Sequence, residues 1–379
     1  MKELGIYIHI PFCAKKCSYC DFTSFGDAEE KIPVYADALV KEITSWKDQL
    51  ADYKVRSIFI GGGTPTIVPV KEMDRVMESL YQCFSIEEGI EFSIESNPGT
   101  IDKEKLQYYL ASHINRISMG LQAWQDTLLK SLGRIHDRAQ FVQNYGLARE
   151  MGFQNINVDL MFGLPGQNIS QWKETLGAVA ALKPDHISAY SLKIEEGTLF
   201  DVLYEKGKLY LPSEEEDRKM YEDAIEFLQG YGYRHYEISN FARAGKECVH
   251  NKIYWNNGEY IGIGLGAHSY WNRRRFANTT EFEEYIEKVK SNQNPTAHVG
   301  YITIEEEIAE TMFLGLRMME GISIPAFIRR FGVSPTDIYQ KTIEKFVEQG
   351  LLEVDQNHIR LTRRGIDVSN QVFTEFLPN

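Results

Sequence analysis

Hydrophobic and polar residues alternate along several short stretches in the first half of the chain, and helix-like patterns separate these stretches. In residues 5–10, Ile6, Ile8 and Ile10 would share one face of a strand, and Tyr7 and His9 the other. Six such stretches predict strands at residues 5–10, 55–60, 90–95, 115–121, 155–161 and 186–191. Helical patterns lie between them, for example at residues 34–50, 71–83 and 139–151. This alternation predicts an α/β fold of parallel strands joined by crossover helices, and six units indicate an open, partial (β/α)6 barrel.

The second face of these strands is polar, which is unusual for the inside of a barrel. In residues 90–95, Glu91, Ser93 and Glu95 share one face, opposite Phe92 and Ile94. A barrel with a polar interior is expected to enclose a ligand, and barrel sites are built at the carboxyl ends of the strands. Each polar residue there could instead be an ordinary solvated side chain. The polar residues closest to the strand ends are Glu95, Gln122 and Asp159.

The pattern changes after residue 191. Ser213 and Glu216 form a predicted capping box, which begins a helix that stops at Gly230. Residues 231–300 are rich in Tyr, Trp, Asn and Gly and predict strands and loops. Helical patterns follow at residues 304–320, 325–331 and 337–349, then a hairpin at 352–361, an order that resembles a winged helix. We therefore expect a barrel in residues 1–230, a connecting region in 231–300 and a helical, winged-helix-like domain in 301–379.

Composition and charge narrow the partners. The 379 residues carry a formal net charge of −13, and 43% of them are hydrophobic. Nucleic-acid binding relies on clustered Lys and Arg, so the acidic balance argues against such a partner. Residues 301–379 hold eight Lys and Arg against twelve Asp and Glu, so their role is expected to be a protein contact or a lid. No apolar run is long enough to cross a bilayer. We expect a cytoplasmic protein; peripheral membrane contact and a homodimer stay open.

Three of the five cysteines, Cys13, Cys17 and Cys20, fall within eight residues directly after the first predicted strand. Three thiolates at this spacing can hold three irons of a [4Fe–4S] cluster and leave the fourth iron open for a ligand. A structural zinc site normally has four protein ligands, and a disulfide framework needs an even number of cysteines. The remaining alternative is that the three side chains are simply buried or bind an adventitious metal.

A glycine run follows the second predicted strand: Gly61-Gly62-Gly63-Thr64-Pro65. Its backbone amides can approach a ligand closely, although a tight turn is the plainer explanation. It is not a P-loop, because no GK[ST] follows. Together with the CxxxCxxC spacing and Tyr19 before the third cysteine, this GGGTP run resembles the radical S-adenosylmethionine (SAM) superfamily. The resemblance implies a [4Fe–4S] cluster, and SAM bound by its open iron and by Gly62, Gly63 and Thr64.

Further positions resemble one branch of that superfamily, the oxygen-independent coproporphyrinogen oxidase family and its relatives, over nearly the whole chain. The resemblance implies that Glu95 and Arg134 bind the methionyl amino and carboxylate groups of SAM. It implies ribose contacts for Gln122 and Asp159, and a SAM contact for Tyr7. Arg134 could otherwise be a surface cation. The oxidases proper carry a further cysteine two residues after the triplet, where this chain has Phe22.

His250-Asn251-Lys252-Ile253-Tyr254-Trp255 fits the HNxxYW motif of a haem-chaperone branch of this family. The resemblance implies haem binding and delivery to acceptor haemoproteins such as respiratory enzymes, without coproporphyrinogen oxidase activity. His250 is the expected haem ligand, with Cys248 as its rival, although a lone His is more often a hydrogen-bonded structural residue. The run 273–275, three arginines, fits either a solvated edge or the haem propionates. Two alternatives stay open: a coproporphyrinogen III oxidase, and a radical SAM enzyme that modifies haem.

Overall fold

A curved sheet of twelve strands forms the frame of the molecule in the computed structural model, which describes residues 2–378. Six neighbouring strands of this sheet are parallel, and each of the six predicted strands corresponds to one of them. In sheet order they are β1 (Lys2–Ile10), β4 (Tyr53–Gly62), β5 (Ser85–Ser96), β6 (Arg116–Gln122), β7 (Ile156–Phe162) and β8 (His186–Ser191). The predicted open, partial barrel is confirmed.

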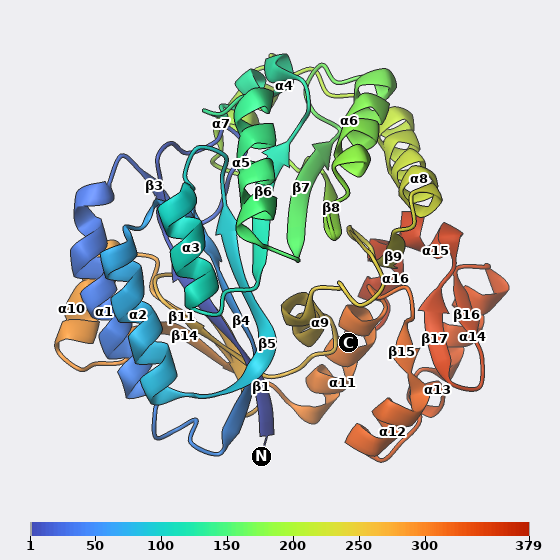
Figure 1. Ribbon diagram of the computed structural model, residues 1–379. Coiled ribbons are helices and arrows are strands. Elements are labelled where there is room, and N and C mark those ends of the chain that lie inside the picture. The colour runs from blue at the N-terminus through green and yellow to red at the C-terminus, as the bar shows by residue number, and fades with distance from the viewer. Residues whose placement is uncertain (1, 379) are drawn as a thin grey trace.

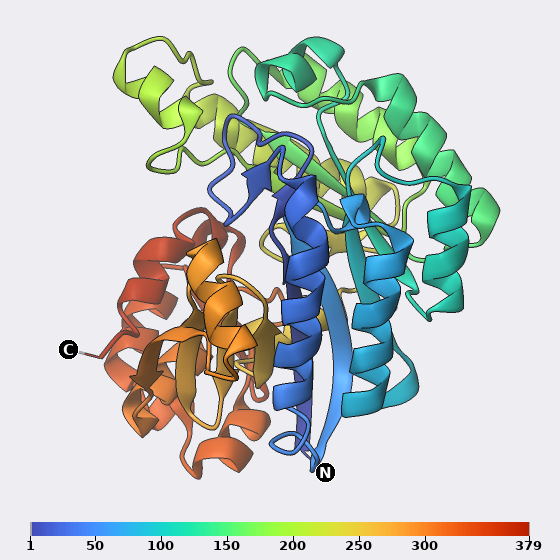
Figure 2. The same ribbon diagram turned by 90° about the vertical axis from the view of Figure 1, so that its left-hand side faces the viewer.

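Helices cover the outer face of this curved sheet (Figures 1 and 2). The apolar face of β1 packs beneath them, and Ile6, Ile8 and Ile10 are almost fully buried. Because the side chains of a strand alternate, the polar face of the same strands must line the inside of the barrel. The helices between the parallel strands are α1 (Ile32–Ser45), α2 (Val70–Cys83), α3 (Lys103–Ala111), α4 (Asp126–Ser131), α5 (Arg138–Met151) and α6 (Ile169–Leu182).

Both ends of the six-stranded parallel sheet are extended by further strands, most of them antiparallel. After α7 (Leu199–Glu205) and α8 (Glu214–Gly230), β9 (Arg234–Glu237) and β10 (Asn240–Ala242) pair beside β8. The predicted capping box of Ser213 and Glu216 is present at the start of α8. At the other end, β11 (Tyr260–Ile263) is parallel to β1, and β12 (His268–Trp271), β13 (Arg274–Asn278) and β14 (Thr296–Tyr301) follow.

Residues 231–300, expected to be strands and loops, also contain two helices. The first, α10 (Phe282–Lys290), packs beside α1 on the outer face. The second, α9 (Val249–Trp255), lies against the inner face of β1 and β4 and carries the HNxxYW motif (Figure 1). The polar side chains at the base of the barrel therefore face a helix.

The C-terminal part has a hydrophobic core of its own, built around Met312, Phe327, Phe346 and Ile359. The helix predicted over residues 304–320 ends at Gly315, and a short strand that pairs with the hairpin follows it. The resulting small three-stranded sheet fits the expected winged-helix-like arrangement. Its elements are α11 (Ile304–Gly315), β15 (Ile322–Ser323), α12 (Ile324–Phe331), α13 (Pro335–Ile338), α14 (Gln340–Glu348), β16 (Leu352–Val354), β17 (His358–Leu361), α15 (Arg363–Asp367) and α16 (Ser369–Thr374).

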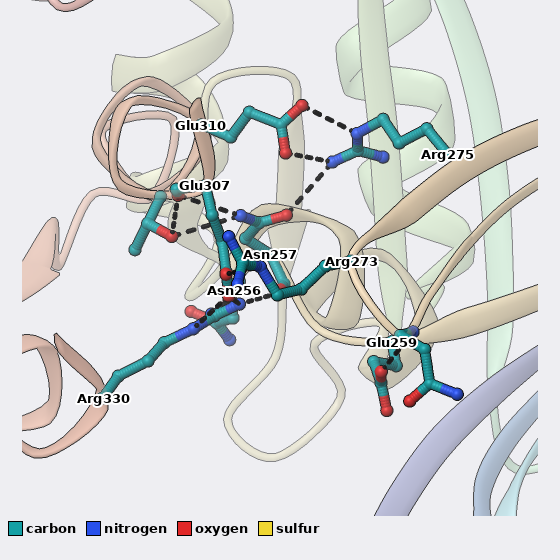
Figure 3. Close-up of polar contacts among 10 residues, drawn as sticks. Asn256, Asn257, Glu259, Arg273, Arg275, Glu307, Glu310 and Arg330 are labelled. Atoms are coloured by element: carbon teal, nitrogen blue, oxygen red, sulfur yellow. Dashed lines mark hydrogen bonds and ion pairs between the residues drawn. The ribbon is translucent and has the colours of Figure 1, made fainter. Parts of the chain in front are cut away.

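Ion pairs join this C-terminal part to the sheet (Figure 3). Glu310 on α11 accepts two hydrogen bonds from Arg275 on β13, at 2.7 and 2.8 Å. Glu307, one turn earlier, pairs with Arg330 at 2.7 Å and with Arg273 at 3.3 Å. Bidentate pairs between arginine and a carboxylate fix orientation as well as adding energy. These contacts therefore hold α11 in a defined position beside α9.

Gly262 permits a close approach of strands next to β1, where it lies opposite Tyr7 in the register. A Cβ atom at residue 262 would collide with the carbonyl oxygen of His268. Overpacking a tight contact typically costs about 1–3 kcal/mol. Gly146 offers the matched control, because it lies exposed in α5 with open space around it.

We predict that Gly262→Ala lowers the urea midpoint of the reduced, cofactor-free protein, whereas Gly146→Ala raises it. The gain in the second variant comes from helix propensity and should be about 0.5–1 kcal/mol. Urea denaturation followed by circular dichroism measures both midpoints. Equal midpoints for the two variants would contradict the close contact between β11 and β12.

Candidate functional site

A cavity of about 340 Å³ opens at the carboxyl ends of the parallel strands. The predicted residues that line it are Cys13, Cys17, Tyr19, Cys20, Gly62, Gly63, Glu95, Gln122, Arg134 and Asp159. They come from the loop after β1 and from four successive strands or the loops that follow these strands. The parallel arrangement therefore brings together groups that lie far apart in the sequence.

The loop that carries the three cysteines packs against α7 and the segment after α4. The Ser18 amide donates to the Leu132 carbonyl at 3.0 Å, and the Phe200 amide donates to the Ser18 carbonyl at 3.0 Å. The Tyr19 ring lies 6.4 Å from that of Phe200. Burial raises the pKa of the Cys13 and Cys20 thiols. The two hydrogen bonds of Ser18 hold this loop against both α7 and the segment after α4.

Each cysteine differs in what surrounds it. The Thr64 hydroxyl contacts the Cys13 sulfur at 3.5 Å, and an Arg134 amine contacts the Cys17 sulfur at the same distance. Within residues 2–378, no three His, Cys, Asp or Glu side chains are grouped tightly enough to ligate one metal ion. A [4Fe–4S] cluster places one sulfur ligand on each of several irons, so its ligands need not converge on a point.

The glycine run places backbone between the cysteine loop and Glu95. A Cβ atom at residue 63 would lie 3.0 Å from the Cys13 sulfur and 2.6 Å from the Phe12 carbonyl oxygen. The Gly62 amide donates to Glu95 at 3.0 Å, and Gly62 has a positive φ of 113°. Glycine is needed at both positions, because a side chain at residue 63 would fill the space beside Cys13 and one at residue 62 would collide with the His9 ring.

Glu95 is a half-buried carboxyl near the end of β5. Burial raises its pKa to about 8, and the charge of Asp159 acts in the same direction. The Gly62 amide and the charge of Arg116 only partly offset these effects. An acid with a raised pKa is suited to a cationic ligand, which would restore its charged form.

Arg134, between α4 and α5, lines the same cavity and is half-buried. Its guanidinium donates to the Gly120 carbonyl at 2.7 Å and to the Asn97 side chain. Neither partner is a carboxylate, so the positive charge stays available for an anionic ligand. The cavity thus presents both a carboxyl group and a guanidinium cation.

Two further predicted residues complete the wall formed by β6 and β7. Asp159 accepts from Ser118 at 2.9 Å and from Asn157 at 2.7 Å, which orients its carboxylate. Gln122 has a positive φ of 70°, rare for a residue other than glycine, at the point where β6 ends. Both are placed where hydroxyl groups of a ligand could be bound.

Tyr7 is not among the residues that line this cavity. Its hydroxyl bonds to the His9 ring at 3.0 Å, and its own ring lies 6.5 Å from that of His250. Tyr7 therefore belongs to a layer between the cavity and α9.

His250 is held in the interior with both ring nitrogens occupied. Nδ1 lies 2.8 Å from the Ser57 hydroxyl, and Nε2 lies 2.7 Å from the Tyr254 hydroxyl. Burial lowers its pKa to about 3, so the imidazole is neutral. Cys248 is also buried, and its thiol contacts Glu91 at 3.3 Å. In this conformation His250 is a hydrogen-bonded core residue.

Two residues missed by the sequence analysis organise the site. Glu91 binds the start of α9, because it accepts from the Cys248 thiol and from the amides of Val249 and His250. Asn97 joins Thr64 and Arg134. Glu91 lies on the same polar face of its strand as Glu95, and this alternation in the sequence could have identified Glu91 as a site residue.

Each of the three arginines of the run 273–275 has a partner within the protein, and Arg275 also borders a cavity beside Trp255. Arg273 and Arg275 are paired with Glu307 and Glu310, as shown in Figure 3. Arg274 stacks on the Tyr301 ring at 5.1 Å. The run therefore serves the contact between the sheet and the C-terminal part.

Comparison with known proteins gives two family matches and full-length relatives. Residues 7–179 match the Radical SAM superfamily, and residues 302–368 match the HemN C-terminal domain. The heme chaperone HemW of Bacillus subtilis is 36% identical over 372 residues, which cover 98% of each chain. HemW of Lactococcus lactis is 35% identical and covers 99% of this chain and 98% of its own. The chain belongs to the HemW family.

A solved structure extends this result to the fold. The coproporphyrinogen III oxidase HemN from Escherichia coli, a radical SAM enzyme, superposes with a TM-score of 0.87 and 26% identity, over 99% of this chain and 90% of that chain. As a radical SAM protein, this HemW relative belongs to a superfamily whose members bind a [4Fe–4S] cluster and SAM. Three cysteine sulfurs, a half-buried acid and an arginine without an acidic partner at one cavity fit these two groups. None of the helices between residues 2 and 378 has the length and hydropathy of a membrane span.

Glu95 should make the stability of the cofactor-free protein depend on pH. Between about pH 4.5 and 8, the unfolded state releases the Glu95 proton while the folded state keeps it, so this group costs more stability as the pH rises. Glu95→Gln should therefore stabilise the protein, with a gain that grows across this range to the order of 2 kcal/mol at pH 8. Urea midpoints at several pH values measure it.

The exposed Glu196 in a loop provides the control for this experiment. Glu196→Gln should show no gain that grows with pH. A Glu95→Gln gain that stays constant from pH 5 to pH 8 would contradict the raised pKa.

Proposed function

We propose that this protein is a haem chaperone that binds haem and transfers it to acceptor haemoproteins. The observation that carries the proposal is the full-length identity of 36% to a HemW named as a heme chaperone. The HNxxYW motif on α9, at the base of the same barrel as the cluster cavity, supports it. Respiratory enzymes are the proposed acceptors, and a homodimer with peripheral membrane contact is part of the same proposal.

The cofactor site within this proposal is the cavity at the strand ends. Cys13, Cys17 and Cys20 would hold the cluster, and the backbone of Gly62, Gly63 and Thr64 would border SAM beside Tyr19. When bound and reduced, a cluster of this kind supplies the electron that cleaves SAM to a 5′-deoxyadenosyl radical. The other residues of the site would bind SAM and orient it.

Each remaining polar group suits one part of SAM. Glu95 suits the methionyl ammonium, because a cation would restore its charge, and Arg134 suits the carboxylate. Asp159 and Gln122 suit the paired ribose hydroxyls. We propose that Tyr7 supports the SAM site without contacting SAM. Its hydroxyl positions the His9 ring, and its own ring lies between the cavity and His250.

Haem binding is proposed to involve His250 as the iron ligand. The neutral imidazole has the right electronic state for a metal ligand. Its Nε2 is hydrogen-bonded to Tyr254, so ligation requires this bond to open. Cys248 is the less suitable rival, because burial raises its pKa to about 12 and the thiolate is the form that binds metal.

A second function, oxidative decarboxylation of coproporphyrinogen III, is favoured by the structural likeness to HemN. The position two residues after Cys20 is Phe22, where the oxidases proper carry a fourth cysteine. The two functions differ in their readout, since one binds haem and the other releases protoporphyrinogen.

The cluster assignment predicts a difference between two cysteines. After anaerobic treatment with iron and sulfide, the wild-type protein should bind about four irons and show a low-temperature spin resonance once reduced by dithionite. Cys17→Ser should lose this signal, because it removes one ligand. Cys83→Ser, at the far end of α2, is the matched control and should keep it. Stoichiometric zinc in place of iron in the wild type, with no resonance, would refute the assignment.

Haem titration and an activity assay on one preparation test the chaperone proposal. The wild type should bind haem with defined Soret bands, His250→Ala should lose the bands of axial ligation, and His298→Ala on exposed β14 should keep them. The same anaerobic preparation should form no protoporphyrinogen from coproporphyrinogen III. Robust turnover would favour the oxidase, and unchanged bands in His250→Ala would remove His250 as the ligand.

A further inference from the structure

Arg317 lies two residues beyond the end of α11, and its surroundings differ from those of the paired arginines in Figure 3. Its guanidinium lies over the Trp255 ring, 4.3 Å from the ring centre. Its nearest acid, Glu237 on β9, is 3.8 Å away, beyond hydrogen-bond distance. Its Nε is buried without a hydrogen-bond partner. By contrast, Arg275 donates two bonds to Glu310 at 2.7 and 2.8 Å.

The surroundings of Arg317 hold several polar atoms without partners. Glu237 is completely buried, and its Oε2 accepts no hydrogen bond from any described residue. Asn240, 3% exposed, donates to the other Glu237 oxygen and leaves its own Oδ1 unpaired. The indole N–H of Trp255 is also buried and unpaired. Buried polar groups are normally hydrogen-bonded, so a cluster of orphaned ones marks a place where a ligand or water completes the network.

The position of Arg317 is fixed from both sides. The Ile238 amide donates to the Arg317 carbonyl at 3.1 Å, and the Met319 amide donates to the Tyr236 carbonyl at 3.0 Å. The Trp255 ring supports the flat face of the guanidinium, which leaves its edge free to meet a planar anion. Burial raises the pKa of Glu237, which favours its neutral form and leaves the arginine charge less compensated.

This cluster lies next to two cavities. Tyr190 lines the cofactor cavity, and the side chain of Asn240 is close enough to act on the Tyr190 hydroxyl. Trp255 borders a second cavity of about 380 Å³, whose walls include Tyr254, Tyr260 and Phe313 and the paired Arg275 and Glu310. Arg317 is not one of its lining residues, but it stacks on the Trp255 ring that is. Aromatic walls suit a flat, apolar macrocycle, and an arginine beside them suits an acid at the edge of such a ligand.

We propose that Arg317, supported by Trp255, binds a carboxylate group of the tetrapyrrole ligand. The inference rests on the proposed function and adds to it the part of the ligand that is recognised and a role for the C-terminal domain. A carboxylate would accept two parallel hydrogen bonds from the guanidinium edge. A residue of the HemN C-terminal domain would thus contact the ligand, and ligand binding would join this domain to α9 and β9.

The test removes the carboxylates from the ligand and the guanidinium from the protein. Wild type and Arg317→Gln are each titrated with haem and with haem dimethyl ester, in which both propionates are esterified. The wild type should prefer haem by about 10- to 100-fold, the range of a hydrogen bond to a charged group. Arg317→Gln should bind both ligands equally, with the affinity that the wild type has for the ester.

Controls separate this role from a structural one. Arg274→Gln, at an exposed arginine stacked on Tyr301, should keep the full preference. Arg317→Lys keeps the charge but not the fork-shaped donor set, so it should keep only part of the preference; it decides the question if Arg317→Gln does not fold. An undiminished preference for haem in both Arg317 variants would overturn the inference.

Two further measurements separate a haem carboxylate from the SAM carboxylate, and failure of the Arg317 role from failure of the proposed function. SAM affinity of the cluster-loaded protein should be the same in wild type and Arg317→Gln; a loss there, with the haem preference intact, would assign Arg317 to the amino-acid carboxylate of SAM and overturn the proposal. If the wild type binds no haem, the proposed function itself fails. If it binds haem and its ester equally, only the role of Arg317 fails.

Discussion

The polar inner face of the parallel sheet is the constraint on which the rest of the molecule depends. Strand alternation buries Ile6, Ile8 and Ile10 under the outer helices, and it forces Tyr7 and His9 inward. Buried polar groups cost free energy unless they find partners. The polar side chains of the inner face therefore need hydrogen-bond partners, opposite charges or a bound ligand.

The two ends of the barrel meet this demand in different ways. At its base, α9 occupies the interior. Glu91 accepts hydrogen bonds from the amides at the start of this helix, and the Ser57 hydroxyl is hydrogen-bonded to the His250 ring. At the carboxyl ends of the strands, no helix of residues 2–378 takes up the polar groups, and neither Glu95 nor Arg134 has an oppositely charged side-chain partner: Glu95 accepts from the Gly62 amide, and Arg134 contacts the Gly120 carbonyl, Asn97 and the Cys17 sulfur. One end is therefore completed by the chain itself, and the other is suited to cofactors.

Much of this arrangement could be predicted from local sequence. Alternation gave the six parallel strands, because burial on one face repeats every two residues, and the capping box of Ser213 needs only four residues. The partners of the arginines in residues 273–275 could not be predicted, because Glu307 and Glu310 lie more than thirty residues further along the chain. The same holds for His250, whose partner Ser57 is separated from it by 193 residues. Local sequence patterns therefore predict helices and strands, whereas the hydrogen-bond or ion-pair partner of a side chain depends on tertiary contacts.

Charge balance explains why arginines without acidic partners are informative in this chain. It contains 54 acidic residues against 41 Lys and Arg, so carboxylates are in excess. Arg273 and Arg275 each have one and link the sheet to the C-terminal part, whereas Arg330 pairs with Glu307 inside that part (Figure 3). Arg134 has none, and Arg317 has only a buried acid beyond hydrogen-bond distance. Because a free guanidinium in partly buried surroundings is costly, ligand carboxylates are the partners that we propose for these two positions.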